Sequence, residues 1–204
     1  RVGMKMHLYP HRDGFLETEK DLNLVSEAAL AGWLQADGFV GKYNHGTNQS
    51  LTVEFETVNK AEREWVYANL ASVFPGAHSH ERTIPMQSLE LDYRRIRLYG
   101  KILEDFVNKY DLLKSWKEKR VPKELFTAPR PVVAAYLKSI FQADGYVGGK
   151  NTSIRIGFAV INPLWAEDIQ LLLFRCGIYS RRYIKKEKRT DRHNLNVVEI
   201  SIGS

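Results

Sequence analysis

A six-residue segment, Gln-Ala-Asp-Gly-aromatic-Val, occurs twice in this chain, at residues 35–40 and 142–147. In both copies an apolar run with helical spacing ends in one acid, Asp37 or Asp144, and a glycine follows. A single Asp-Gly pair would indicate only a turn. Two copies in the same context indicate a duplicated unit that carries one acid at the end of each helix. We expect the glycine after each acid to cap its helix in the left-handed conformation.

Small residues lie at matching places in the two helical runs, four positions apart. They are Gly32 and Ala36 in the first run and Ser139 and Ala143 in the second. This spacing puts each pair on one helix face, where it permits close backbone approach. Packing the two helices side by side would bring both acids together at the negative ends of two helix dipoles. A hard divalent cation would relieve the repulsion between them, and Mg²⁺ is the natural candidate for oxygen ligands and phosphate.

The two copies resemble the paired motifs of the LAGLIDADG homing endonucleases, in the single-chain form often found inside inteins. The first copy matches the family motif at Leu30, Ala31, Gly32, Leu34, Ala36, Asp37 and Gly38, and the second at Leu137, Ile140, Ala143, Asp144 and Gly145. The second copy departs at Lys138 and Ser139, where the family prefers Ala and Gly. Gln35 and Gln142 replace a frequent first acid. The resemblance covers residues 26–204.

This resemblance implies an α+β fold of pseudo-twofold duplicated αββαββ(α) units. Two antiparallel sheets would form a DNA-binding saddle with the motif helices at the interface. The implied activity is divalent-metal-dependent phosphodiester hydrolysis, which makes a staggered double-strand break at a long asymmetric site. Asp37 and Asp144 would hold Mg²⁺, with Mn²⁺ able to replace it, and the protein would act on double-stranded DNA as a monomer. Similar enzymes often carry a basic residue near the scissile phosphates, and we expect Lys101 to be a catalytic residue of this kind.

The order of patterns along the chain indicates αββαββα, followed by the same order without its last helix. We expect helices at 26–37, 60–73, 101–110, 131–144 and 163–174, and strands at 39–43, 51–57, 78–84, 89–99, 146–148, 153–161, 178–188 and 195–202. Ser26 would cap the first helix. The expected segments are an extension of unknown role at 1–25, a first half at 26–110, a linker at 111–130 and a second half at 131–204 whose final helix is missing.

Alternation of polar and apolar residues gives each strand a face that a helix can cover and a face that can meet DNA. The polar face would lie along the major groove, where side chains reach base edges and phosphates. The candidate DNA contacts are Lys42, Asn44, Asn48, Gln49, Arg82, Arg94, Arg97, Asn151, Arg155, Arg181, Arg182, Lys185 and Lys188. A solvated surface residue is the alternative interpretation for each of them, because alternation assigns a face only when the register is right.

Net charge supports a polyanionic partner. The formal charge is +6, and residues 181–192 carry seven basic and two acidic side chains. This basic segment suits DNA, or else it is a solvated hairpin tip. A single cysteine, Cys176, excludes an internal disulfide framework, and no apolar stretch is long enough to span a membrane. We therefore expect an intracellular, cytoplasmic protein associated with DNA and not with a membrane.

Three alternatives share these residues. A DNA-binding protein without catalysis could use the same fold, although intact acids in both halves argue against it. An RNA maturase that assists intron splicing would carry the same motifs. The acids could also be simple helix caps in an unrelated α+β protein. Self-splicing is not expected from these residues alone, because the chain begins with Arg1 and ends with Ser204.

Overall fold

The computed structural model describes residues 19–42, 50–84, 92–150, 153–186 and 196–202. The helical elements are α1 (Glu19–Asp37), α2 (Lys60–Val73), η1 (Lys101–Leu103), α3 (Glu104–Lys109), η2 (Lys123–Phe126), α4 (Arg130–Asp144) and α5 (Pro163–Arg175), where η marks a 3₁₀ turn. The strands are β1 (Gly38–Lys42), β2 (Leu51–Thr57), β3 (His80–Thr83), β4 (Arg94–Tyr99), β5 (Gly145–Lys150), β6 (Ser153–Val160), β7 (Arg181–Lys186) and β8 (Asn196–Ile202). None of the helices within these ranges has the length and apolarity needed to cross a bilayer.

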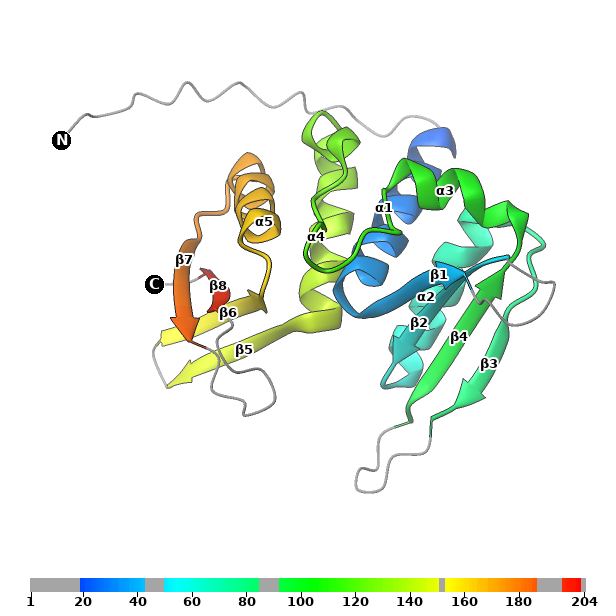
Figure 1. Cartoon of the computed structure of the whole chain (residues 1–204), viewed down its shortest axis with the longest axis horizontal. Coiled ribbons are helices and arrows are strands. Elements are labelled where there is room, and N and C mark those ends of the chain that lie inside the picture. The colour runs from blue at the N-terminus through cyan, green and yellow to red at the C-terminus, as the bar shows by residue number, and fades with distance from the viewer. Residues whose placement is uncertain (1–18, 43–49, 85–91, 151–152, 187–195, 203–204) are drawn as a thin grey trace.

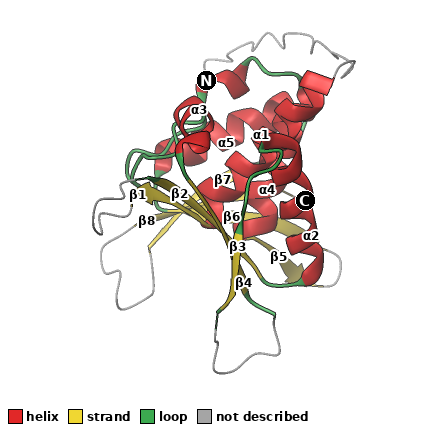
Figure 2. Ribbon diagram, turned by 90° about the vertical axis from the view of Figure 1, so that its right-hand side faces the viewer, coloured by secondary structure: helices red, strands yellow, loops and turns green. Residues whose placement is uncertain are grey.

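Two four-stranded antiparallel sheets form the halves of the molecule. Their strand orders are equivalent, β1-β2-β4-β3 in the first half and β5-β6-β8-β7 in the second. The registers are equivalent too, since Gly38 pairs with Phe55 and Gly145 pairs with Phe158. Figure 1 shows the two halves side by side with α1 and α4 between them, and Figure 2 shows the helices gathered on one side of the strands. The expected α+β architecture of duplicated units is confirmed.

The motif helices α1 and α4 pack closely because small residues face each other. A Cβ added at Gly32 would lie 2.4 Å from the backbone oxygen of Tyr136 and 3.1 Å from the Cβ of Ser139. Such a distance to a backbone atom is sterically forbidden, so the helices could not approach this closely with any larger residue there. The expected side-by-side packing of the two runs therefore follows from the small residues of the motif.

The glycines after the two acids serve a different purpose from the expected one. Neither Gly38 nor Gly145 has a positive φ, and Gly145 is extended, with φ −85° and ψ 166°. The expectation of left-handed caps was wrong. A Cβ at Gly145 would lie 2.2 Å from the oxygen of Phe141, and a Cβ at Gly38 would lie 2.6 Å from the Cα of Leu34. Glycine is needed there because the first residue of the strand folds directly back onto the last turn of the helix.

Several bounds differ from the expected ones: β3 and β7 are shorter, β4 begins at Arg94 and not at residue 89, and three further differences lie in α1, after β4 and in the linker. Helix α1 begins at Glu19, so Ser26 lies inside it and does not cap it. The helix expected at 101–110 is a 3₁₀ turn, η1, followed by the short α3. The linker 111–130 contains η2, and several of its residues are buried, among them Val121 and Leu125. This segment therefore packs as part of the protein core. The strand β2 and the helix α2 have the expected bounds.

Candidate functional site

The two acids lie at the final residues of α1 and α4, and both side chains are exposed. Partial burial, together with the negative charges of Glu56, Asp144 and Glu62, raises the pKa of Asp37 to about 6. Asp37 and Asp144 are thus electrostatically coupled, as their positions at two packed helix ends predict. A carboxyl group in such surroundings gains from a nearby cation, because the cation offsets the repulsion that favours protonation.

The donor set fits a hard divalent cation that also binds substrate oxygens. Within the described ranges, no group of three or more His, Cys, Asp and Glu side chains is arranged to hold a metal. Two carboxylates can supply part of an octahedral shell, and Mg²⁺ commonly completes its shell with water and phosphate oxygens. Asp37 and Asp144 are therefore the residues that could hold a metal together with a bound polyanion.

Lys119 is the lysine that the structure brings to the motif helix ends, and the sequence interpretation missed it. Its Nζ donates a hydrogen bond to the backbone oxygen of Gln35, two residues before Asp37. The ammonium also lies 4.7 Å from the centre of the Trp165 ring. Burial lowers the pKa of Lys119, while the charge of Asp144 acts in the opposite direction. No local pattern marks this residue, because it lies in the linker and reaches the site only through tertiary packing.

Gln35 forms the junction between both motif helices and the linker. Its side chain is buried, its Nε2 donates to the backbone oxygen of Arg120 at 3.2 Å, and its Oε1 accepts from the hydroxyl of Tyr136. Its backbone oxygen accepts from Lys119. An amide can donate and accept at once, which a carboxylate cannot do. Glutamine in place of the family's frequent acid therefore suits a position where one side chain joins two elements.

Lys101 lies away from the acids. Strand β4 begins near them, because Arg94 pairs with Thr57 while Gly38 pairs with Phe55. The strand ends at Tyr99, and the amide of Gly100 donates to the oxygen of Leu51 at the start of β2, 2.9 Å away. Lys101 follows at the outer end of the sheet and is exposed. Its expected catalytic role is not supported by this placement, and Lys119 is the better candidate.

The polar face of the first sheet carries two of the expected DNA contacts, Arg82 and Arg97. Arg82 pairs with Arg95 across β3 and β4, and Arg97 pairs with Glu54 across β4 and β2. These positions alternate with the buried Ile96 and Leu98. Arg95 belongs to the same face, and it was not among the expected contacts. The sequence could have predicted this position, because residues two apart in a strand point to the same face and Arg95 is two residues before Arg97.

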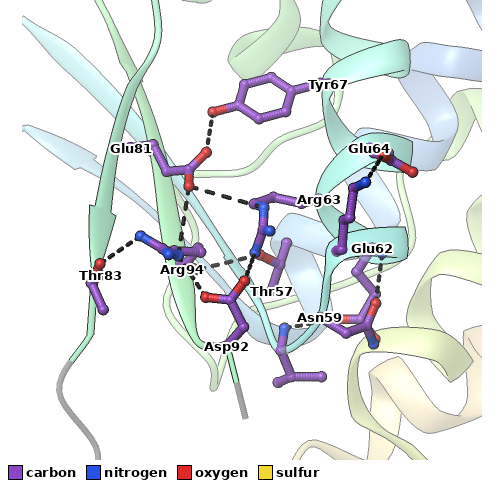
Figure 3. Close-up of polar contacts among 12 residues, drawn as sticks. Thr57, Asn59, Glu62, Arg63, Glu64, Tyr67, Glu81, Thr83, Asp92 and Arg94 are labelled. Atoms are coloured by element: carbon purple, nitrogen blue, oxygen red, sulfur yellow. Dashed lines mark hydrogen bonds and ion pairs between the residues drawn. The ribbon is translucent and has the colours of Figure 1, made fainter.

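Arg94 lies on the opposite face, beside α2, and is not proposed as a groove contact. Its Nε lies 2.7 Å from Asp92 and 3.7 Å from Glu81. Arg63 of α2 pairs with the same Asp92 at 2.7 Å, and the Tyr67 hydroxyl of α2 donates to Glu81 at 2.7 Å (Figure 3). These contacts fasten β3 and β4 to α2. Arg94 was expected to contact DNA, but it is an even number of residues from Ile96 and Leu98 and therefore lies on the same strand face as these buried residues.

The second sheet presents Arg155, Arg181 and Lys185 on its polar face. Arg181 pairs with Ser201, and Lys185 pairs with Val197, on the side opposite the buried Val198 and Ile200. Glu199 accepts from Lys185 and also interacts with the hydroxyl of Tyr146, whose pKa is raised mainly by partial burial and then by this acid. Tyr146, Arg155, Lys185 and Glu199 line one pocket. Arg182 lies on the other face, where its Nη2 is 3.8 Å from Glu167 of α5.

The remaining expected contacts divide into two groups. Lys42 is exposed at the end of β1, but it shares its face with the partly buried Val40, so the structure places it on the helix side. Five others lie outside the described residues: Asn44, Asn48, Gln49, Asn151 and Lys188. The described contacts on the polar faces are thus Arg82, Arg97, Arg155, Arg181 and Lys185.

Comparisons with known proteins agree with this geometry. Residues 131–202 match a family model described as a LAGLIDADG-like domain. The structure resembles that of I-DmoI in complex with DNA and Mn, with a TM-score of 0.60, 14% identity, and coverage of 87% of this chain and 90% of that one. I-WcaI bound to its DNA recognition sequence matches with a TM-score of 0.51 and 17% identity over 88% of this chain and 76% of that chain. The N-terminal LAGLIDADG domain of WhiA matches with a TM-score of 0.53 and 12% identity, over 97% of this chain and 88% of that one. The fold is therefore that of the LAGLIDADG homing endonucleases.

Curated relatives match parts of this chain, and the chain spans only a small part of their own length. A translation initiation factor IF-2 of Thermococcus kodakarensis is 43% identical over 67 residues, which are 33% of this chain and 6% of that protein. A glutamine–fructose-6-phosphate aminotransferase of Methanocaldococcus jannaschii is 31% identical over 51% of this chain and 10% of its own length. A DNA gyrase of Mycolicibacterium flavescens is 29% identical over 78% of this chain and 27% of that one. The matched region is thus a minor part of each of these proteins, whose names are unrelated.

Proposed function

We propose that this chain, whose fold is that of the LAGLIDADG homing endonucleases, is a site-specific DNA endonuclease that makes a staggered double-strand break at a long asymmetric site. The observation that carries the proposal is the electrostatic coupling of Asp37 and Asp144 at the ends of two packed helices. The polar faces of two sheets extend from those helix ends in equivalent registers. Acids at the centre of a basic, two-sheet surface suit phosphodiester hydrolysis better than binding alone.

Each residue has a stated task in this proposal. Asp37 and Asp144 hold the divalent cation, in keeping with the Mn and Mg that accompany I-DmoI in two solved structures. A bound cation would supply an activated water and stabilise the charge on the leaving oxygen. The ammonium of Lys119 lies at the motif helix ends, where it would stabilise negative charge on the scissile phosphate. Arg82, Arg95 and Arg97 of one sheet and Arg155, Arg181 and Lys185 of the other neutralise phosphates and contact base edges.

The two halves read different DNA half-sites in this proposal. The polar face of the first sheet bears His80, Arg82 and Arg97, whereas that of the second bears Tyr146, Arg155 and Arg181. Because direct readout depends on the donors and acceptors in the groove, two different faces select two different sequences. The target is therefore asymmetric, and one chain binds it as a monomer.

We also infer that the natural context of this module is an insertion in a host protein, such as an intein. The support is that proteins named for translation, amino-sugar synthesis and DNA topology match over 6 to 27% of their lengths. A segment shared by such proteins has an activity separate from theirs. Mass spectrometry of the product of the longer gene, expressed intact, tests this by showing whether the segment is excised from a host.

Cleavage of a randomised DNA-site library tests the main proposal. Reactions with Mg²⁺, with Ca²⁺ and with a chelator run in parallel, with Asp37→Asn and Asp144→Asn as variants. A recurrent long site that is cut with Mg²⁺ and not by either variant would support the endonuclease. Binding of a recurrent site without cleavage would favour the second candidate, a DNA-binding protein without catalysis. Binding of structured RNA in place of DNA would instead indicate a maturase.

A further inference from the structure

We propose that the second half of the protein positions Lys119 at the acid site through two side chains of α5 and its cap, Asn162 and Asp168. This inference rests on the proposed endonuclease function, since it assigns Lys119 a task in cleavage. It goes beyond that function by making the linker a part of the site. The segment that carries Lys119, residues 116–121, is called the lysine segment below.

Asn162 holds the lysine segment by its backbone. Its Nδ2 carries two hydrogens, which it shares among the backbone oxygens of Trp116, Lys117 and Lys119, at 3.2, 3.1 and 2.7 Å. Its Oδ1 accepts from the amides of Leu164 and Trp165 at 3.0 and 3.1 Å, so the same side chain caps α5. Asn162 is 5% exposed, and hydrogen bonds in such dry surroundings fix geometry strongly.

Asp168 holds the other end of the lysine segment. Its carboxylate accepts from Nε and Nη2 of Arg120 at 2.6 and 2.8 Å, and from the amide of Val121 at 3.2 Å. The two-fold contact with a guanidinium fixes orientation as well as distance. Asp168 is 6% exposed, and it lies on a helix whose core residues Ile169 and Leu172 are fully buried. The clamp is therefore anchored in the core of the second half.

Between these two anchors, Lys119 extends toward the first half. Its ammonium lies over the Trp165 ring and donates to Gln35, while the backbone oxygen of the next residue, Arg120, accepts from the Gln35 amide. A free lysine side chain has four rotatable bonds, and holding its charge at one place otherwise costs rotamer entropy. Fixing the backbone on both sides of Lys119 reduces that cost, which is how preorganised charge aids catalysis.

The first half contains a matched position without this clamp. Asn59 caps α2 as Asn162 caps α5, and its Oδ1 accepts from the amide of Glu62 at 2.9 Å. Within the described residues, the Asn59 amide group makes no hydrogen bond to a linker. Capping by itself therefore does not require the contacts of the Asn162 Nδ2 with three backbone oxygens, and those contacts hold the lysine segment.

The test compares Asn162→Ser with Asn59→Ser. Serine is a good N-cap residue, so both variants keep their helices, but its hydroxyl is too short to reach the three linker oxygens. We expect Asn162→Ser to slow single-turnover cleavage on the order of 10²-fold, because small displacements of an active-site group have effects of that size. DNA affinity, measured with Ca²⁺, should stay within about twofold of the parent, since phosphate contacts are unchanged. Asn59→Ser should cleave at the parental rate.

A double-variant cycle separates positioning from a general loss of structure. Lys119→Met removes the charge, and the double variant Asn162→Ser/Lys119→Met should cleave no more slowly than Lys119→Met alone. The proposal would be overturned if the rate losses of the two single variants multiplied in the double variant, or if Asn162→Ser cleaved as fast as the parent. Asp168→Asn provides a second release of the lysine segment if Asn162→Ser fails to fold, and it should show the same non-additivity with Lys119→Met.

A readout without cleavage makes the two proposals separable. The indole N–H resonance of Trp165, assigned by Trp165→Phe, reports on the ammonium that lies over its ring. Lys119→Met should shift this resonance, and Asn162→Ser should shift it in the same direction, whereas Asn59→Ser should not. If the parent cuts no DNA, the proposed function fails while this spectrum still shows whether the clamp holds Lys119. An unmoved resonance in both Asn162→Ser and Asp168→Asn would disprove the clamp even in an active enzyme.

Discussion

The two sheets have equivalent strand orders and registers, but the basic residues on their polar faces differ in how they pair with carboxylates. In the first sheet Arg95 and Arg97 of β4 pair with carboxylates of β2, since Nη1 of Arg95 lies 3.3 Å from Glu54 and Nε of Arg97 lies 2.5 Å from the same acid. In the second sheet Glu199 pairs with Lys185 and also interacts electrostatically with Arg155, but no carboxylate of the described residues lies within ion-pair distance of Arg155 or Arg181. The first sheet holds its arginines in fixed orientations, whereas the second exposes more uncompensated charge.

The halves also differ in how their apolar faces are covered. Leu51 and Val53 of β2 are 6% and 0% exposed, and Leu103, Phe106 and Val107, which follow β4, belong to the same core. The equivalent residues of β6, Ile154 and Ile156, are 68% and 44% exposed. No helix among the described residues occupies the corresponding place in the second half. Among the described residues, the apolar face of the first sheet is therefore covered more fully than that of the second.

The largest expected effect on cleavage comes from the acid that each half contributes, Asp37 or Asp144. Asp37→Asn and Asp144→Asn should each reduce cleavage on the order of 10³-fold or more, because each removes a charge that the metal requires. Cleavage assays on matched nicked and intact substrates measure the loss, and binding with Ca²⁺ serves as control. A variant that retains one strand's cleavage at the parental rate would show that each acid serves one strand independently.

A matched pair of substitutions tests whether the apolar face of the first sheet is more buried than that of the second. Leu51→Asp buries a carboxylate without a partner and should lower the free energy of unfolding by about 3 kcal/mol or more. Ile154→Asp places the same group on an exposed surface and should change it by about 0.5 kcal/mol or less. Urea denaturation followed by circular dichroism measures both. A large loss in Ile154→Asp would show that this face is covered in solution.

Salt dependence tests the difference in charge. Arg155→Ala combined with Arg181→Ala should weaken DNA binding and lower the slope of log affinity against log salt by about 2, about 1 for each lost phosphate contact. Arg97→Ala should change the slope less, because Glu54 already offsets its charge. Glu54, whose side chain is only 3% exposed, would instead lose a partner, so this variant should be less stable. Equal slopes for both variants would contradict the comparison.

The smallest effect is a pH-dependent change in stability at Asp37. Its pKa is raised to about 6 in the folded protein, above the usual value of 3.8. The ionised form is therefore disfavoured by the fold, and stability is lost as the pH rises from below the unfolded value through about 6. Asp37→Asn should accordingly raise Tm at pH 8 in the absence of metal and leave it nearly unchanged at pH 4. Differential scanning calorimetry measures this, and an equal rise at both pH values would exclude charge repulsion as its cause.

Local patterns were sufficient for much of the site. The repeated motif predicted two helices that end in Asp37 and Asp144, because helical spacing and a following glycine are properties of consecutive residues. Alternation assigned Arg97 and Arg155 to polar faces, since neighbouring side chains of a strand point in opposite directions. Arg94 and Arg182 were expected to contact DNA together with Arg97 and Arg181, but residues an odd number of positions apart lie on opposite faces of a strand, and the structure puts both on the helix side.

Sequence alone thus determined the duplicated helix–strand order, the pair of acids and the basic character of the chain, all of which depend on residues close together in the chain. Only the tertiary structure decided that Lys119, and not Lys101, lies at the motif helix ends, where it interacts electrostatically with Asp144. That outcome depends on contacts across 84 residues to Gln35 and across 43 residues to Asn162. Such contacts form where buried elements pack, and a linker with no periodic pattern contains no local signal of where its backbone will be held.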